Sequence, residues 1–244
     1  MKITKHGNSL TQLTRFPNFF PMNCYFVRET DGLTVVDSTM PGAAKEILAA
    51  AHAIGLPIKR ILITHSHADH VGSLDQLHAA VPDAEVLLTH RQDRILRGDQ
   101  SSEPGEPSGK MRGSYMRRTT TAKQFYAPGD RIGSLLAVAA PGHTPDQVAF
   151  LDTRDSSLIC GDSFQTITGI GVTGTFRIGF PWISLATWSR AVGVETARAL
   201  VGLTPSRLAA GHGNVLESPV AAMTEAITVE QSNLTPTHGT QIRA

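Results

Sequence analysis

Short apolar runs bounded by turn residues predict β-strands along much of this 244-residue chain. Residues 24–29 and 33–37 are two such runs, and the Asp31-Gly32 pair between them predicts a hairpin turn. Further strands are expected at 59–64, 85–89, 131–132, 135–140, 148–152, 157–162 and 207–210.

Segments with helix-forming residues, the first of them rich in alanine and leucine, predict helices between these strands. Gly55 followed by Pro57 ends the first predicted helix, and Pro82 ends the second. The expected helices cover residues 43–55, 71–81, 90–96, 184–203 and about 217–230. Strands mixed with helices in this way predict two β-sheets covered by helices.

Three segments break this regular pattern. Residues 98–124 contain serine, glycine, proline, lysine and arginine with few aliphatic side chains, which predicts a loop insertion or lid. Residues 164–183 are apolar and glycine-rich, and residues 15–20 form a comparable apolar loop. Because binding residues are often carried by loops on a rigid scaffold, we expect the two apolar segments to line a pocket. The alternative is that their aromatic side chains only fill the core.

The composition is that of a soluble globular protein, with 41% hydrophobic and 18% charged residues. The formal net charge of +1 gives no field that favours a nucleic-acid or membrane partner. No composition break marks a second domain, so we expect one domain over residues 1–232 and a frayed tail at 233–244. The first residues lack the apolar core of a signal peptide, and no apolar run is long enough to span a membrane, which predicts a cytoplasmic protein.

The two cysteines, Cys24 and Cys160, lie far apart in sequence and form no Cys-x-x-Cys pair. We interpret them as buried free thiols in a reducing compartment.

A cluster of histidines follows the predicted strand at 59–64. Three of the ten histidines in the chain, His65, His67 and His70, fall within six consecutive residues together with Asp69. Imidazole and carboxylate groups are the ligands that zinc and similar divalent ions prefer. A loop that leaves a strand can aim such side chains at one point, so the cluster predicts a metal site. A polar surface loop with satisfied histidines is the alternative.

Three further candidate ligands each follow a predicted strand and lie beside glycine. His143 follows the strand at 135–140, Asp162 ends the strand at 157–162, and His212 follows the strand at 207–210. A neighbouring glycine lets the backbone turn tightly at such a position. One residue of this kind is often structural, but three with the same placement strengthen the prediction of a metal site.

At this point the chain resembles the metallo-β-lactamase superfamily. The resemblance runs from Asp37 through residues 64–70 (THSHADH) to His143, Asp162 and His212, in the order that the superfamily shows. It implies an α/β fold, a four-layer αββα sandwich of two mixed β-sheets flanked by helices, with the site along one edge.

The resemblance also implies a role for each candidate residue. His65, His67 and His143 would bind a first metal, while Asp69, His70 and His212 would bind a second. Asp162 would bridge the two metals, and Asp37 would accept hydrogen bonds that orient the histidine loop. Two zinc ions are the expected cofactors, although Mn²⁺, Fe²⁺ or Co²⁺ also suit His/Asp ligands.

A site with two metals predicts a hydrolase in which a bridging hydroxide attacks the substrate. Asp162 and Asp69 are the candidate catalytic residues, because Asp162 would hold both metals and Asp69 could relay a proton to the leaving group. The expected substrate is a moderately hydrophobic carboxylic ester, lactone or thioester. A phosphoesterase, an iron-dependent persulfide dioxygenase and a non-catalytic metal-binding protein are the alternatives.

The resemblance leaves the subfamily open. Asp162 argues against a true β-lactamase, and Cys160 is interpreted as a buried thiol because the ligand position near it is already filled. Glyoxalase II-like thioesterases share all seven ligands. Lactonases of the superfamily carry a tyrosine three residues after the bridging aspartate, where this chain has Gln165.

The insertion at 98–124 carries five basic residues that do not extend into a larger basic patch. We weigh a lid for an anionic substrate or an arm for a homodimer against a mobile solvated loop. The basic residues are Lys110, Arg112, Arg117, Arg118 and Lys123.

Overall fold

Two large β-sheets form the centre of the computed structural model, which describes residues 1–235. The first sheet has seven strands in chain order, antiparallel from β1 to β4 and parallel from β4 to β7. Its strands are β1 (Lys2–His6), β2 (Leu10–Arg15), β3 (Met22–Arg28), β4 (Leu33–Val36), β5 (Ile58–Leu62), β6 (Glu85–Leu88) and β7 (Gln124–Phe125).

The second sheet has six strands in the order β15-β14-β11-β10-β9-β8. Only β11 and β14 run parallel; the other neighbours are antiparallel. Its strands are β8 (Arg131–Ile132), β9 (Leu135–Ala139), β10 (Val148–Asp152), β11 (Ser157–Gly161), β14 (Arg207–Ala210) and β15 (Leu216–Glu217). A separate two-stranded sheet joins β12 (Phe164–Gln165) to β13 (Gly171–Val172).

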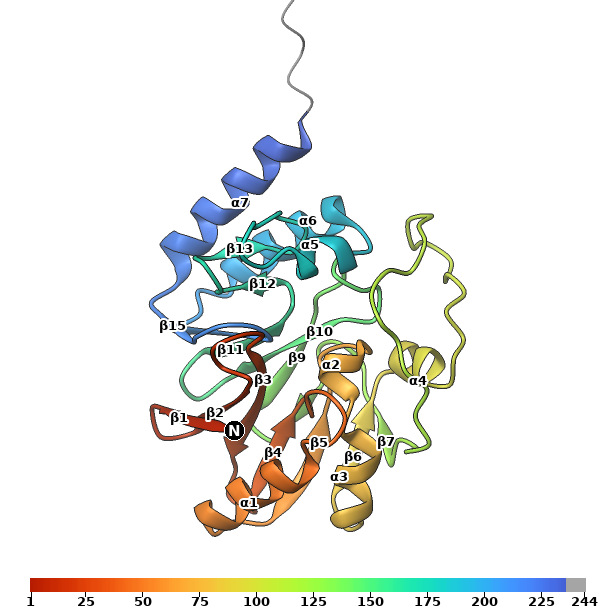
Figure 1. The fold of residues 1–244 in the computed structure, drawn as a ribbon, viewed down its shortest axis with the longest axis vertical. Helices are drawn as coiled ribbons and strands as arrows, with labels where there is room; N and C mark the ends of the chain where they lie inside the picture. Colours follow the sequence, from red (N-terminus) through yellow and green to blue (C-terminus); the bar gives the residue numbers. More distant parts are fainter. Residues whose placement is uncertain (236–244) are drawn as a thin grey trace, which may run out of the picture.

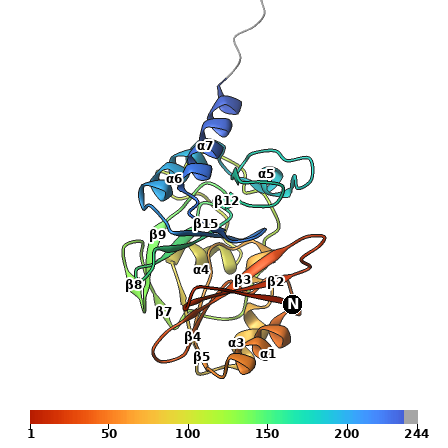
Figure 2. The same ribbon diagram turned by 90° about the vertical axis from the view of Figure 1, so that its left-hand side faces the viewer.

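Three hydrophobic clusters show that the elements are arranged in four layers. One cluster packs α1 and α3 on the first sheet, a second lies between the two sheets, and a third packs α6 and α7 on the second sheet. Figures 1 and 2 show these helix pairs at opposite ends of the molecule with the strands between them. The fold is therefore the predicted αββα sandwich. The helices are α1 (Ala44–Ile54), α2 (Ala68–Val71), α3 (Leu74–Ala80), α4 (His90–Leu96), α5 (Trp182–Ala186), α6 (Arg190–Gly202) and α7 (Val220–Leu234).

The helix predicted over residues 71–81 is present as α3 but begins only at Leu74, because residues 68–71 form a separate short helix, α2. Gly72 lies between them, and a Cβ atom at this position would come within 2.5 Å of the backbone of Met40. The hydroxyl of Ser73 accepts a hydrogen bond from the amide of Ala43 and donates one to the carbonyl of Met40. Close packing against residues 40–43 therefore breaks the helix directly after the histidine motif.

The predicted helix over residues 184–203 is also divided. Helix α5 begins earlier, at Trp182, and α6 begins only at Arg190. Between them the amides of Trp188 and Ser189 donate to the carbonyls of His143 and Gly142, at 2.8 and 2.9 Å. In a continuous helix these two amides would donate to carbonyls of the preceding turn. Because the helix is broken, they are free to bind the loop that carries His143.

Other boundaries differ less. The polar N-terminal residues form the hairpin β1–β2, whose ranges the sequence did not delimit, and β3 begins at Met22 rather than Cys24. The last helix was expected at 217–230 and covers Val220–Leu234, so it includes the first two residues of the predicted tail. The rest of that tail, from 236 onward, lies outside the described residues. Residues 98–123 hold neither helix nor strand apart from a bridge between His67 and Tyr115.

Both cysteines are buried and unpaired, as predicted. Cys160 packs in the cluster between the second sheet and its helices, and burial raises the pKa of its thiol. Within residues 1–235, no helix combines the length and the apolar character needed to cross a membrane.

Candidate metal centre

Loops that leave the strands bring the seven candidate ligands to one end of the two sheets. The parallel pairs β4–β5 and β11–β14 each end at this edge. The loop after β5 carries the histidine motif, whose last residues form α2, and the loop after β9 carries His143. Asp162 directly follows β11, and His212 lies two residues after the end of β14. Residues far apart in sequence therefore meet because their strands end side by side.

Three of the histidines, which we call the three-histidine group, are His65, His67 and His143. Their ligand atoms lie within 4.8 Å of one another. His67 Nδ1 lies 3.2 Å from His65 Nε2 and 3.0 Å from His143 Nε2. All three side chains are buried, so this group forms a compact set of imidazole nitrogens with little exposure to solvent.

The second set, which we call the Asp69 group, consists of Asp69, His70 and His212. Its ligand atoms also lie within 4.8 Å of one another, with His212 Nε2 3.3 Å from Asp69 Oδ2. His70 and His212 are buried, whereas a quarter of the Asp69 side chain is exposed. Asp69 is therefore the member of this set that reaches the solvent side.

Asp162 lies between the two groups. Its Oδ1 is 3.4 Å from His70 Nε2, and its Oδ2 is 3.3 Å from His212 Nε2 and 3.4 Å from His143 Nε2. The carboxylate thus faces imidazoles of both groups at once. The resemblance implies a bridging role for Asp162, and a carboxylate in this position could contact metals held by both groups.

Protein acceptors orient three of the imidazoles toward the centre. His70 Nδ1 donates to Asp37 Oδ2 at 2.8 Å. His212 Nδ1 donates to the carbonyl of Pro21 at 2.7 Å, and His67 Nε2 donates to the carbonyl of Arg112 at 2.8 Å. Because the acceptor fixes which nitrogen carries the proton of the neutral ring, the other nitrogen of each ring faces the cluster as the atom that could bind a metal.

Hydroxyl groups hold the other two imidazoles. His65 Nδ1 lies 3.1 Å from Thr64 Oγ1, which itself donates to Asp37 Oδ2 at 2.8 Å. His143 Nδ1 lies 3.1 Å from Thr173 Oγ1 and 3.3 Å from Thr187 Oγ1. Of these supporting groups, only Asp37 was singled out from the sequence.

The unpaired atoms of the cluster fit divalent cations. His70 Nε2 and Asp162 Oδ1 are buried side-chain atoms without a hydrogen-bond partner. A buried polar atom without a hydrogen bond or a bound ion destabilises the folded protein. In the three-histidine group, imidazole nitrogens face one another although their outer nitrogens are already held by the protein. Lone pairs of nitrogen and carboxylate oxygen converging in this way indicate a site for two metal ions.

The two groups differ in the direction of their pKa shifts. Burial lowers the pKa of all three imidazoles in the three-histidine group, and that of His143 falls to about 3. Burial also opposes protonation of His212, but Asp162 and Asp69 outweigh it and raise the pKa of His212 to about 10. Asp162 and Asp37 raise the pKa of His70 in the same way.

A cavity of about 700 Å³ opens directly onto the cluster. Its floor includes His67, Asp69, His143, Asp162 and His212, and its wall comes from residues of the 19–20, 113–114 and 179–186 segments. The two apolar segments expected to line a pocket therefore both contribute to it. Gln165 is buried in β12 and is not among the lining residues.

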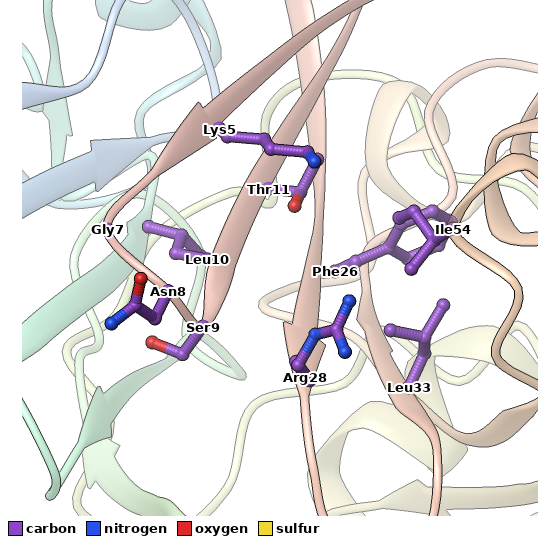
Figure 3. Close-up of a pocket in the computed structure, with 10 residues that line it drawn as sticks. All are labelled: Lys5, Gly7, Asn8, Ser9, Leu10, Thr11, Phe26, Arg28, Leu33 and Ile54. Carbon is purple, nitrogen blue, oxygen red and sulfur yellow. The ribbon is translucent and has the colours of Figure 1, made fainter.

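A second, smaller cavity of about 190 Å³ lies elsewhere, beside the β1–β2 turn (Figure 3). Two cations, Lys5 and Arg28, and the polar residues Asn8 and Ser9 line it together with core residues of the first sheet. No histidine or carboxylate is among the described residues that line it, so we place the candidate chemistry in the larger cavity.

Comparison with known proteins agrees with this geometry. The chain is 42% identical over 228 residues to the uncharacterized protein YobT of Bacillus subtilis, which covers 93% of this chain and 97% of that protein. It is 30% identical over 158 residues to the hydroxyacylglutathione hydrolase of Rhodospirillum rubrum, covering 65% of this chain but only 52% of that enzyme. The match thus spans about half of the enzyme's length.

Solved structures share the fold. The metallo-beta-lactamase from Pontibacter korlensis superposes with a TM-score of 0.71 at 16% identity, covering 94% of this chain and 98% of that one. A family model described as the metallo-beta-lactamase superfamily matches residues 17–212, a range that contains all seven candidate ligands. The chain therefore belongs to the metallo-beta-lactamase superfamily.

Proposed function

We propose that this chain is a two-metal hydrolase of carboxylic esters, lactones or thioesters, with zinc as its metal. The observation that carries the proposal is the position of Asp162, which faces imidazoles of both ligand groups within 3.4 Å. A mononuclear site would need only one of these groups. Zinc suits the set because it binds imidazole and carboxylate ligands, and catalytic zinc sites keep one position open for water or substrate.

Two such ions, when bound, would polarise the carbonyl of the substrate and lower the pKa of a bound water to near neutrality. The three-histidine group would hold one ion and the Asp69 group the other, with Asp162 between them. Of these residues Asp69 is the most exposed to the cavity, so it is the carboxylate placed to hold a proton on its way to the leaving group. The apolar wall would limit the access of bulk water to the reacting carbonyl.

Among the described residues that line the cavity, none is lysine or arginine. A phosphodiester would bring a negative charge that only the metals could balance, so this lining favours carbonyl substrates over phosphoryl substrates. Thioesters are included because a hydroxyacylglutathione hydrolase is among the relatives.

The test is a substrate panel with protein purified without chelator. We expect about two zinc ions per chain and hydrolysis of a nitrophenyl ester, a lactone or a simple thioester. Oxygen consumption with glutathione persulfide and bound iron would support a dioxygenase instead. Turnover of a phosphodiester but of no carbonyl substrate would support a phosphoesterase.

Replacement of Asp162 tests the site itself. We expect Asp162→Ala to lower kcat/KM by at least about 10³-fold, because the residue that joins the two ligand groups is lost. Asp152→Ala is the matched control, since Asp152 is an equally buried carboxylate that pairs with Arg154 away from the cluster. Near-normal activity in Asp162→Ala, or an equal loss in both variants, would contradict the assignment.

A further inference from the structure

We propose that the cavity beside the metal cluster is an acyl-binding site for an uncharged, apolar chain, and that Trp182 and Leu185 set its specificity. This proposal rests on the hydrolase function proposed above and names the substrate class of that site. The acyl group would lie along the apolar wall while its carbonyl reaches the cluster.

The composition of the wall is the first argument. Large apolar side chains line the cavity from two separate parts of the chain, the loop after β2 and the segment that leads into and includes α5. The cavity, at about 700 Å³, has the size of sites that bind small organic molecules. Its large apolar lining residues include Phe19, Phe20, Phe180, Trp182, Ile183 and Leu185.

The exposure of these side chains is the second argument. Trp182 is 56% exposed, Leu185 is 58% exposed and Phe19 is 92% exposed, although all three line the same cavity. Single exposed apolar residues are ordinary, but several around one opening mark a binding surface. Because the surface is continuous with the catalytic cluster, the group that covers it belongs to the substrate.

Helix α5 presents its residues to the cavity in a helical spacing. Trp182, Leu185 and Ala186 are three and four residues apart and therefore lie on one face. Trp182 and Leu185 line the cavity and are each more than half exposed, whereas Ile183 lines it as a buried side chain. The hydroxyl of Ser184 in α5 donates to the carbonyl of Gly174 at 2.8 Å, which ties the helix to the turn after β13.

The absence of countercharges is the third argument. Every ionisable residue among the described lining residues, Asp69 and Asp162 with three histidines, belongs to the metal cluster. A carboxylate at the far end of the acyl chain would therefore lose water without gaining a partner. Arg112, the nearest cation in sequence to the lining residues Gly113 and Ser114, is exposed and does not itself line the cavity.

A chain-length series measures this directly. Nitrophenyl esters from acetate to decanoate share one leaving group, and we expect kcat/KM to rise by about fourfold for each added methylene until the cavity is full. The matched charged substrate is a decanoate ester that carries a carboxylate at the chain end. It should lose most of this gain, and a rate equal to that of the uncharged ester would overturn the proposal.

Variants of α5 locate the effect. Trp182→Ala should reduce the ratio of decanoate to acetate turnover by at least about tenfold, with Leu185→Ala acting in the same direction. Ile178→Ala is the control, because Ile178 is a 92% exposed residue of the same segment that does not line the cavity. A ratio unchanged in Trp182→Ala, or equally changed in Ile178→Ala, would refute the acyl site while the hydrolase function stands.

A binding measurement keeps the acyl site testable if no ester is hydrolysed. Methyl nonyl ketone, an uncharged and unreactive analogue, should change the tryptophan fluorescence of the metal-loaded protein. The Trp182→Ala variant retains Trp188 and should lose this response. Binding without hydrolysis would refute the proposed reaction alone, whereas no response in the unaltered protein would refute the acyl site.

Discussion

The three-histidine group and the Asp69 group are close neighbours, yet they meet an incoming cation in different states. Burial lowers the pKa values of His65, His67 and His143, so these imidazoles are neutral at physiological pH. Carboxylates raise the pKa values of His70 and His212, so these imidazoles hold protons until a metal displaces them. The first group is ready to bind a cation, whereas the second must first release protons.

The difference comes from the carboxylates. In the Asp69 group, Asp37, Asp69 and Asp162 surround two imidazoles, and protons on those imidazoles balance the negative charge when no metal is bound. Of these three carboxylates, Asp162 alone lies within 4 Å of a nitrogen of the three-histidine group. The acidic residues that favour a bound divalent cation therefore favour protonated His70 and His212 when no metal is bound.

The largest expected difference is in the pH dependence of metal binding. Each proton that a metal displaces makes the metal affinity change by about tenfold per pH unit. Release of protons from both His70 and His212 would therefore change the affinity by up to about a hundredfold per pH unit. Below the raised pKa of about 10 of His212, the affinity of the Asp69 group should thus increase with pH. The metal affinity of the three-histidine group should stay nearly constant.

Competition with a coloured chelator between about pH 6 and pH 8 measures the binding of both ions. Parallel slopes for the two ions would contradict this comparison.

The sequence predicted the ligands better than it predicted their supports. The ligands are side chains of distinctive type placed at strand ends, and the structure brings all seven together. Two of their supports are the backbone carbonyls of Pro21 and Arg112. Every residue type has such a carbonyl, so the sequence does not indicate which ones will accept a hydrogen bond. The same holds for the breaks on either side of the site. Gly72 and residues 187–189 interrupt helices because of contacts with distant loops, and local pattern contains no information on these contacts.

The edge of the first sheet shows a second limit of the sequence pattern. Strand β1 pairs only with β2, and most of its residues are at least partly exposed, so its apolar and polar positions do not alternate clearly. The central strands are buried on both faces and stand out as apolar runs. Pattern therefore predicted the strands that carry the site more accurately than the hairpin at the edge.

Asp37→Asn should weaken the Asp69 group more than the three-histidine group, because Asp37 contacts His70 directly but reaches His65 only through Thr64. Asp37 Oδ2 accepts hydrogen bonds from both His70 Nδ1 and Thr64 Oγ1. An amide nitrogen there would donate instead, which favours the tautomer of His70 whose Nε2 carries the proton and cannot bind a metal. We expect a loss of about 10- to 100-fold in affinity for one of the two ions.

Calorimetric titration with zinc checks this expectation, with Asp75→Asn as control. Asp75 also accepts backbone and hydroxyl hydrogen bonds, from Thr119 and Thr120, but it is not a member of either ligand group. The three-histidine group should keep its affinity in Asp75→Asn and lose less affinity than the Asp69 group in Asp37→Asn. An equal loss at both ions in Asp37→Asn would show that Asp37 supports the whole loop rather than His70.

Gly113→Ala should weaken the other group by a smaller amount. Gly113 has a φ of +89°, and a Cβ atom there would lie 2.3 Å from His67 Nε2, at the hydrogen bond to the Arg112 carbonyl. The insertion would then have to shift away from His67, which we expect to cost the three-histidine group about tenfold in affinity. The visible spectrum of the cobalt-substituted protein would report the altered ligand.

Gly105→Ala separates this contact from backbone strain. Gly105 lies in the same insertion with a φ of +90°, but a Cβ atom there meets nothing within 4 Å. Both variants carry the same left-handed strain of about 1 kcal/mol, so both should lose a similar amount of stability. Only Gly113→Ala should also lose metal affinity, and only at the three-histidine group. If the two variants bind metal equally well, the insertion does not position His67, and the two groups differ in their carboxylates alone.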